Sequence, residues 1–483
     1  QWKQNFSTNV FIKQFGIIGN GVIDDQSAWD NLISYAESNA VVIDARGGYI
    51  FLVGQISFDG ATGLTILSKG SQFKFDNRYS TTSPCFRFQN MNSFIFDEIY
   101  ITNTGGYETG RSRLFIADNC DNWSGDAVRV SYDNQHLPED SGVGDLWQLE
   151  ANSRAIRISA CENWEVRLLK TTKADIGLRI LDCAQYEIGR VVIETYMKGG
   201  RVDGGANGKI GSWTATGETP TFENHLRQTY NDWRKDRPGN NGLLLSDDNT
   251  TTYNTLRNFS LGEFLIEDCG EHGIRVSGEN DRKNIKIGEG TTRRTGASGI
   301  KFLGSDTTYT RFLTLGTVTV IDAKVNEQTV INSSTTAVNS VNYAFNNSGT
   351  ITISGSFDDS TAMAWPEFFG GEILTIILSG TASNNATFTI SSRDSDTQIT
   401  VNETVTTESA VAGTVTFTNE GKISHGIQAY NLRNFIFEGL ATIADDETYS
   451  CQDGINFHDA ARGVINSCSI GGPLGSGLSI RPS

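Results

Sequence analysis

The sequence lacks most of the features that identify membrane proteins, metalloproteins and disulfide-bonded domains. It has no apolar run near the ~20 residues that a membrane-spanning helix needs, and no secretory signal. Only 5 histidines occur, without the spacing of metal ligands, and none of the 7 cysteines forms a CxxC pair. We therefore expect no metal ion and no cofactor.

Proline is also scarce, with 7 residues against 51 glycines, and basic residues are outnumbered by acidic ones. With 39 Lys and Arg against 56 Asp and Glu, the formal net charge is −17. Nucleic acid and anionic membrane surfaces repel such a chain, so neither is expected as a partner. The many glycines predict tight turns between short elements.

Three of the cysteines adjoin strand-like segments, namely Cys161, Cys183 and Cys269. Cysteine without a partner behaves as a small apolar residue and is usually buried. We expect these three side chains in the core, rather than in disulfides or at a metal.

A short phrase of the form small–apolar–x–apolar returns along the chain at intervals of about 22 to 31 residues, except for two longer gaps, after Gly199 and after Gly299. Its copies begin at Ala127, Ala155, Gly177, Gly199, Gly242, Gly273, Gly299, Gly426, Gly454 and Gly477. A second phrase, Asn–apolar–x–apolar, often follows, as at Asn163, Asn258, Asn284 and Asn434. Asn suits the start of such a strand because it tolerates left-handed φ in a tight turn.

The apolar residues of both phrases alternate with a period of two, which predicts strands and excludes helical repeats. One unit of this length cannot bury its apolar face alone, whereas stacked units can. The unit is also shorter than the about 40 residues of a propeller blade. We therefore predict an all-β solenoid, a parallel β-helix in which each unit forms one coil.

The stretch FGIIGNGVIDDQSAWDNLI, residues 15–33, leads into a predicted helix that ends near Ser38. Asp24 or Asp25 is its expected N-cap, and the Asp pair is interpreted as turn and cap chemistry rather than catalysis. Such a helix covers the open end of a solenoid, which would otherwise present unpaired backbone groups.

This stretch, with VVIDARGGYIFLVGQISF at residues 41–58, resembles the opening of the pectate-lyase-like family of right-handed parallel β-helices, which includes bacteriophage tailspikes. The resemblance implies a homotrimer that binds, and often cleaves, bacterial surface polysaccharide. It also implies a location on the virion tail or otherwise outside the cell. Because the chain begins with Gln1 rather than Met, we expect a preceding region that joins the phage tail or baseplate.

The coil phrases stop near Ala323 and resume at Gly426, and the residues between are rich in Thr, Ser and Asn. Short alternating segments there predict an inserted small β-sandwich or barrel. The predicted organisation is an N-terminal segment with the capping helix at 1–50, the parallel β-helix at 51–323, the inserted module at 324–421 and the continued β-helix at 422–483. A C-terminal cap or trimerisation region is expected to follow the last coil phrase.

Coils of a solenoid stack about 4.8 Å apart, so the x residues should form a column on the outer face of one sheet. The predicted column is Arg129, Arg157, Arg179, Arg201, Leu244, Arg275, Lys301, Gln428, Asn456 and Ser479. It is basic over most of its length in an acidic protein. Either carboxylates such as Asp126, Asp175, Asp182 and Asp203 pair with these cations, or the column binds the carboxylates of an acidic polysaccharide.

The longest excursion from the coil pattern covers residues 211–240 and contains Trp213, Tyr230 and Trp233. Long loops of compact solenoids are often functional, and exposed aromatic rings can stack on sugars. We expect these three residues to contact substrate or, alternatively, to pack on a neighbouring subunit.

Hydrolysis of a glycosidic bond usually needs two carboxylates, about 5–9.5 Å apart. One member of the pair is expected from Asp203, Asp247 and Asp248, and the other from Glu267, Asp268 and Glu271. The alternative is β-elimination on a uronate, in which cations neutralise the carboxylate and a base removes the neighbouring proton. Arg179, Arg201, Arg275, His272 and Tyr230 are the candidates for those roles.

Three functions remain open on the sequence. The first is a tailspike-type depolymerase, with glycoside hydrolysis expected over elimination and with Arg157, Arg179, Arg201, Arg275, Lys301 and His272 binding the polymer. The second is a secreted lyase or hydrolase of the same fold. The third is an adhesin that binds glycan without cleaving it.

Overall fold

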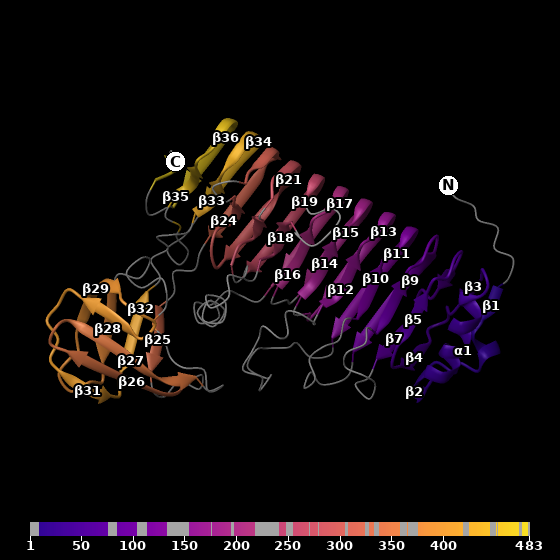
Figure 1. Cartoon of the computed structure of the whole chain (residues 1–483), viewed down its shortest axis with the longest axis horizontal. Coiled ribbons are helices and arrows are strands. Elements are labelled where there is room, and N and C mark those ends of the chain that lie inside the picture. The colour runs from indigo at the N-terminus through magenta and orange to yellow at the C-terminus, as the bar shows by residue number, and fades with distance from the viewer. Residues whose placement is uncertain are drawn as a thin grey trace.

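The structure, a computed structural model, is a right-handed parallel β-helix with one capping helix and one inserted antiparallel module (Figure 1). The described residues are 9–75, 85–103, 114–132, 154–174, 176–194, 198–217, 241–247, 255–269, 271–278, 280–304, 308–323, 328–332, 338–357, 365, 375–418, 425–444, 451, 453–472 and 476–481. Among them, no helix has the length and apolar character needed to cross a membrane.

Sheet B is the simpler of the two solenoid sheets, and its twelve parallel strands follow chain order. They are β5 (Ile56–Asp59), β8 (Phe86–Gln89), β10 (Phe115–Asp118), β12 (Arg154–Ser159), β14 (Ile176–Leu181), β16 (Lys198–Asp203), β18 (Leu243–Ser246), β20 (Ile274–Val276), β22 (Ile300–Phe302), β33 (His425–Tyr430), β35 (Asp453–His458) and β37 (Leu478–Arg481).

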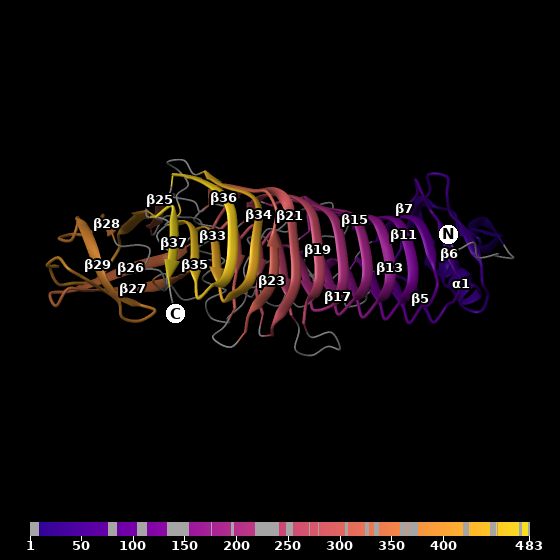
Figure 2. The same cartoon turned by 90° about the horizontal axis from the view of Figure 1, so that it is seen from above.

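Sheet A closes the other side of each coil with seventeen strands, many of them long enough to bend around the core. They are β1 (Asn9–Phe11), β2 (Asn20–Asp24), β3 (Val42–Asp44), β4 (Ile50–Val53), β6 (Thr65–Leu67), β7 (Gln72–Phe75), β9 (Ile95–Asn103), β11 (Asp121–Tyr132), β13 (Glu162–Thr172), β15 (Ala184–Glu194), β17 (Ala206–Thr216), β19 (Arg257–Cys269), β21 (Arg282–Thr295), β23 (Thr310–Leu315), β24 (Val318–Ala323), β34 (Leu432–Ala444) and β36 (Ala461–Gly471). Figure 2 shows the coils stacked along one axis.

One continuous apolar core runs through the solenoid because matched positions of successive coils stack on each other. Phe94, Trp123, Trp164 and Tyr186 form such a stack, with ring centroids 4.9–5.2 Å apart and nearly parallel planes. Cys161, Cys183 and Cys269 are wholly buried in the same core, as predicted.

The asparagines of the second phrase have the left-handed backbone predicted for them, with φ of 52° at Asn258 and 56° at Asn284. Their side chains also link the coils. Asn284 donates its amide to Asn258 at 2.7 Å, and Asn258 donates to Asn207 at 2.9 Å. The repeated Asn therefore sets both the turn and the register of neighbouring coils.

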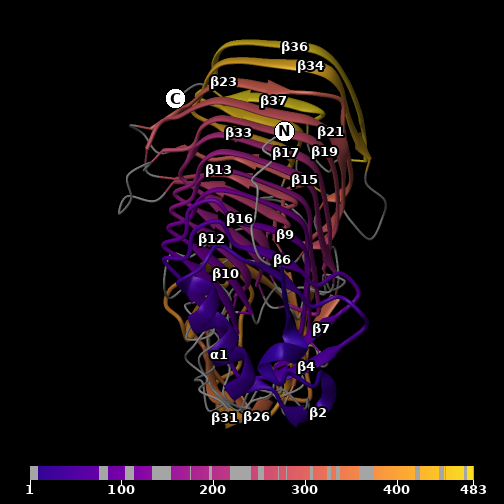
Figure 3. The ribbon, with the colours of Figure 1, turned by 90° about the vertical axis from the view of Figure 1, so that its right-hand side faces the viewer.

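The helix α1 (Gln26–Glu37) lies across the N-terminal end of the solenoid, as Figure 3 shows. It follows a short 3₁₀ helix, η1 (Ile12–Phe15), and buries Trp29, Leu32 and Ala36 against the first coils. Asp25 occupies the N-cap position without a side-chain cap bond. Its carboxylate instead accepts the N–H groups of Ile18 and Gly19, which fixes the preceding glycine-rich turn.

The inserted module is an eight-stranded antiparallel sheet with its own apolar core. Its strands are β25 (Gln328–Asn332), β26 (Val338–Asn346), β27 (Thr350–Phe357), β28 (Thr375–Ser379), β29 (Thr387–Arg393), β30 (Gln398–Val401), β31 (Glu408–Val411) and β32 (Thr414–Thr418). It leaves the solenoid after β24, and the next strand, β33, pairs with β22 as if nothing intervened. In Figure 1 the module stands apart from the stack of coils.

The long insertions share one position in the coil, the turn from sheet A to sheet B. Residues 133–153 join β11 to β12, residues 218–240 join β17 to β18, and the module joins β24 to β33. Where this turn has no insertion it is short, as between Thr295 of β21 and Ile300 of β22. These three insertions therefore connect the end of a sheet A strand to the start of the next sheet B strand.

Candidate functional site on the outer face of sheet B

The x residues of the coil phrase form one in-register column on the outer face of sheet B, which we call the outer column. Register pairs run from Arg157 to Arg179 and Arg201, and then through Leu244 to Arg275. The outer column continues through Lys301, Gln428, Asn456 and Ser479. Its basic half and its amide half therefore lie on one line along the solenoid axis.

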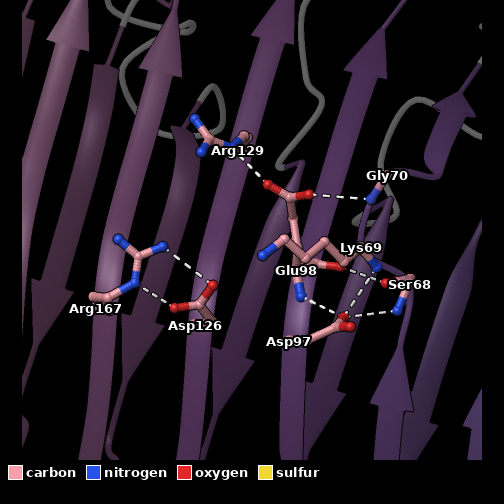
Figure 4. Close-up of polar contacts among 8 residues, drawn as sticks. All are labelled: Ser68, Lys69, Gly70, Asp97, Glu98, Asp126, Arg129 and Arg167. Carbon is pink, nitrogen blue, oxygen red and sulfur yellow. Dashed lines mark hydrogen bonds and ion pairs between the residues drawn. The ribbon is translucent and has the colours of Figure 1, made fainter. Parts of the chain in front are cut away.

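Arg129 does not belong to this column, which corrects the prediction from the phrase. It lies in β11 of sheet A, beside Tyr100 and Lys170, and the outer column has Ile116 of β10 in that coil. Its Nε donates to Glu98 at 2.7 Å, and Glu98 also accepts the N–H of Gly70 (Figure 4). The prediction failed because both sheets use the same small–apolar–x–apolar pattern.

Asp203 neutralises two of the cations of the outer column. Its carboxylate pairs with Nε of Arg179 on the preceding coil at 2.6 Å and with Nε of Arg201 on its own strand, β16. The Asp203 side chain is 0% exposed, so it is a buried counter-ion held between two guanidinium groups. The alternative that carboxylates of the protein pair with the column cations therefore holds for these two arginines. The three side chains together keep one net positive charge.

Glu271, His272, Arg275 and Lys301 come together two coils further on, and we call them the Glu271 cluster. Oε1 of Glu271 lies 3.2 Å from Nη1 of Arg275 and 3.3 Å from Nε2 of His272. Nδ1 of His272 accepts the N–H of Ser298 at 3.1 Å. Because a backbone N–H can only donate, the proton of this imidazole lies on Nε2, facing Glu271.

The pKa shifts within the Glu271 cluster set the protonation state of each member. Burial by itself would raise the pKa of Glu271, but the interactions with His272 and Arg275 outweigh it and hold this pKa well below its usual range. Burial lowers the pKa of His272 to about 4, against the opposing effect of Glu271. Burial, and then the charge of Arg275, lower the pKa of Lys301 to about 8. At neutral pH the cluster therefore holds one carboxylate, two cations and a neutral imidazole.

Two buried polar atoms of the cluster, Oε2 of Glu271 and Nε of Arg275, have no hydrogen-bond partner among the described residues. A buried polar atom without a partner carries a desolvation cost that a bound polar group could remove. Arg275 and Lys301 are in register on neighbouring coils, and among the described residues Glu271 is the carboxylate that acts on both. The arrangement is suited to a ligand that brings a second carboxylate.

Trp213 was expected in a loop that contacts sugar, and this expectation is wrong. It lies inside β17, which runs to Thr216, and its side chain is 0% exposed in the solenoid core. A Trp at an alternating core position cannot be told from a loop aromatic when the strand boundary is misplaced by a few residues. Tyr230 and Trp233 lie outside the described residues, as does Asp248.

The other predicted carboxylates have separate surroundings. Asp247 is buried after β18 and accepts the N–H of Asn280. Glu267 and Asp268 lie in β19, on sheet A, where Asp268 forms a two-point ion pair with Arg294 at 2.5 and 2.7 Å.

Asp203 and Glu271, the pair closest to the outer column, are not brought together. Asp203 ends β16, whereas Glu271 precedes β20, so they sit at opposite ends of strands two coils apart. The two coils alone separate them by roughly 10 Å along the axis, beyond the about 5–9.5 Å of a glycosidase pair. The described residues therefore place Glu271 with cations, and not with a second carboxylate.

A second column of polar residues was not recognised in the sequence. It lies just before the glycine of each phrase, at Asn241, His272, Ser298, His425 and Asp453, all of them buried. In the sequence these residues precede the glycine of each phrase as N-G, H-G, S-G, H-G and D-G. A polar residue before glycine is also common in tight turns, so the pattern alone did not indicate a column. Stacking turns them into a continuous polar line beside the outer column.

No protein-family model and no curated protein matches the sequence. Among solved structures, the chain is similar to PfbA, a surface adhesin of Streptococcus pneumoniae, with a TM-score of 0.46 and 11% identity over 98% of this chain and 91% of that one. It is also similar to ORF18 of Geobacillus virus E2, with a TM-score of 0.40 and 11% identity over 84% and 78% of the two chains.

A third similar structure is a hyperthermoactive exopolygalacturonase from Thermotoga maritima, with a TM-score of 0.40 and 9% identity over 67% of this chain and 89% of that one. At identities of 9 to 11%, these likenesses concern architecture, and the activity or partner of each protein is its own.

Proposed function

We propose that the outer face of sheet B binds an acidic bacterial polysaccharide and cleaves it at the Glu271 cluster. The observation that carries this proposal is the pair Arg275 and Lys301, in register on neighbouring coils, for which the described residues supply one carboxylate, Glu271. A uronate carboxylate would complete the charge balance, and Arg275 offers the planar donor pair that carboxylates bind best.

The reaction that these residues favour is β-elimination. Arg275 would hold the uronate carboxylate and make the adjacent C–H more acidic. At neutral pH Lys301 is mainly the ammonium that attracts the uronate, and its lowered pKa leaves a minor neutral fraction that can remove this proton. The bond to the departing sugar oxygen then breaks and leaves a double bond in the uronate ring. Water protonates the departing oxygen, and the Lys301 ammonium returns the abstracted proton to solvent, so no water is added to the product. Glu271 remains ionised and holds Arg275 and His272 in place.

Hydrolysis is the second candidate, and the same two groups would act in opposite senses. Ionised Glu271 would activate water, while protonated Lys301 would give its proton to the leaving oxygen. This differs from the carboxylate pair expected from the sequence, because the described residues offer no second carboxylate within reach of Glu271.

The two reactions have opposite pH dependences. Elimination needs neutral Lys301, so its rate should rise with pH and level off above about pH 8, the pKa of that amine. Hydrolysis with Lys301 as the acid should slow above the same pH. A rate profile between pH 6 and 10 on a cleaved polymer, with product masses, separates them, because hydrolysis adds water and elimination adds none.

The decisive experiment is depolymerisation of a panel of uronate-containing and neutral bacterial polysaccharides, followed by size exclusion. We expect cleavage of an acidic polymer only, and loss of kcat/KM on the order of 100-fold in Arg275→Ala. Arg167→Ala is the matched control, because Arg167 is an arginine of sheet A, 64% exposed and paired with Asp126. Equal cleavage of neutral polymers, or an unchanged rate in Arg275→Ala, would refute the proposal.

We also propose a setting for this activity, a tailspike-type homotrimer on a virion tail, acting outside the cell. The N-terminal resemblance supports it, and light scattering of the purified chain tests the trimer. A free secreted enzyme is the rival setting. Polymer binding without any loss of polymer size would identify an adhesin instead.

A further inference from the structure

Four basic residues stand in register on four successive coils, at the corner where the chain turns from sheet B into sheet A. They are Arg257, Lys283, Arg311 and Arg433, each the first or second residue of its sheet A strand, and we call them the corner column. Stacked coils lie about 4.8 Å apart, so these cations repel one another unless anions compensate them. The corner column is a basic line in an acidic protein, on a different sheet from the outer column.

The described carboxylates compensate two of these four charges. Nε of Arg311 donates to Asp281 at 2.8 Å, and Nη2 of Arg433 donates to Asp459 at 2.9 Å. The other two members of the corner column form no ion pair within the part of the chain that the structure describes, and both are exposed. Four cations and two carboxylates leave two positive charges, in a chain whose net charge is −17.

Tyr309 supports two of the guanidinium groups without accepting their N–H donors. Its ring centroid lies 4.8 Å from Cζ of Arg311 and 4.5 Å from Cζ of Arg433, so the ring attracts both cations through its face. Among the described contacts of Arg311, the hydrogen bond to Asp281 uses Nε and leaves the two Nη groups as donors. A guanidinium held in this way is prepared for two-point binding of a carboxylate or sulfate group.

An exposed aromatic ring adjoins the corner column. Phe312 directly follows Arg311 and is 54% exposed, and its backbone has a left-handed φ of 57°. The residues in register with it, Asn284 and Asn434, suit that backbone better. Strained positions persist where function needs the side chain they carry, so the ring itself has a use. Its free face can stack on a sugar ring, with the cations of the corner column beside it.

We propose that the corner column and Phe312 bind an acidic polysaccharide, with the aromatic ring against a sugar and the cations on its carboxylate or sulfate groups. The site lies on the same coils as the Glu271 cluster, because Arg275 and Lys283 share one coil and Lys301 and Arg311 share the next. It is nevertheless a separate site, at the start of the sheet A strands.

That the ligand is the polymer cleaved on sheet B rests on the function proposed above, whereas the site itself does not. The corner column and the outer column both follow the solenoid axis on these coils. One long polymer bound at the corner column would therefore be held beside the Glu271 cluster, and its effective concentration there would rise without any further contact.

The test is polymer binding by the full chain, measured by titration calorimetry at low ionic strength. The probes are polygalacturonate, dextran sulfate and neutral dextran, and every variant also carries Arg275→Ala, which prevents the proposed cleavage during the titration. Arg257→Gln combined with Lys283→Gln should weaken the binding of an acidic probe on the order of 10-fold, because two uncompensated cations are lost. The acidic probe that binds more tightly identifies the acid group as carboxylate or sulfate.

The matched control removes two positive charges from other coils. Arg46→Gln combined with Arg167→Gln replaces two exposed arginines that are paired with Asp44 and Asp126. We expect it to change the affinity by less than about 2-fold, since each of these arginines already has its own carboxylate. Equal affinities of the two double variants, equal binding of neutral dextran, or no binding of either acidic probe would overturn the proposal.

Phe312→Asn supplies a readout that loss of structure does not explain. It should weaken the binding of the acidic probe on the order of 5-fold, while the melting temperature does not fall. An unchanged affinity would leave a purely electrostatic surface and overturn the site as a sugar-binding one. Because cleavage is absent from every protein titrated, these results are independent of the depolymerisation panel, and failure of this site is distinguishable from failure of the depolymerase.

Discussion

At the scale of single residues, Lys301 is placed where it costs folding energy. Burial and the neighbouring Arg275 lower the pKa of its ammonium to about 8, from the ordinary 10.5. The methionine in Lys301→Met keeps most of the side-chain length and removes the charge. We expect this variant to raise the free energy of unfolding at pH 7 by on the order of 1–3 kcal/mol, because a buried, poorly compensated charge is removed. Urea unfolding measures the change, and polymer binding should fall at the same time.

The free energy of unfolding contributed by Lys301 should depend on pH. Between about pH 8 and the unfolded pKa of 10.5, the unfolded chain binds a proton that the folded chain does not. Stability from this residue should therefore rise with pH across that window, and Lys301→Met should lack the rise. Lys170→Met is the control, since Lys170 is paired with Glu194 at 2.9 Å on sheet A and should change stability by under about 1 kcal/mol. A less stable Lys301→Met chain would show that the ammonium is well compensated.

At the scale of the element, β23 carries a residue that its backbone does not favour. Phe312 has φ of 57° and a side chain 54% exposed. Its neighbours in register, on β21 and β34, are Asn284 and Asn434, both of which suit that backbone. Phe312→Asn should therefore stabilise the solenoid by about 1 kcal/mol, because Asn adopts left-handed φ more readily and can join the side-chain amides of the coils. Thermal unfolding measures the shift.

Alanine at the same position separates the effect of the exposed ring from the effect of the left-handed backbone. Phe312→Ala removes the exposed ring but still disfavours positive φ, so it should gain less than Asn. If Phe312→Asn lowers the melting temperature instead, the aromatic ring makes a stabilising contact that outweighs the cost of the strained backbone.

The elements also show what the sequence could predict. The coil phrase was sufficient to predict the fold and the outer column from Arg157 to Ser479. In every copy its glycine lies at the turn and its apolar residues lie in the core, so the x residue must face outward. It could not assign Arg129, since sheet A repeats the same letters. It could name Glu271 and His272 as neighbours of Arg275 and Lys301 as the next residue of the column, but not the burial that lowers the pKa of Lys301, because that depends on the packing around it. The line from Ser298 to Asp453 was hidden by an insertion of about a hundred residues.

At the scale of the whole molecule, the inserted module interrupts one turn of a solenoid that is otherwise continuous. Ile300 pairs with Ile427 and Val318 with Ala441, so both sheets join across the insertion. Deletion of residues 324–421 would leave the five residues 422–426 between Ala323 and Ile427. The equivalent turn between Thr295 and Ile300 has four, 296–299, so the shortened turn can close.

We expect this deletion to fold, with a melting temperature of the solenoid within a few degrees of the full chain. Its calorimetric trace should lose one transition, because the module has an apolar core of its own. The proposed cleavage at Arg275 and Lys301 should persist, since both residues belong to coils that the deletion leaves in register. A deletion that folds but neither binds nor cleaves polymer would place the recognition of the glycan in the module.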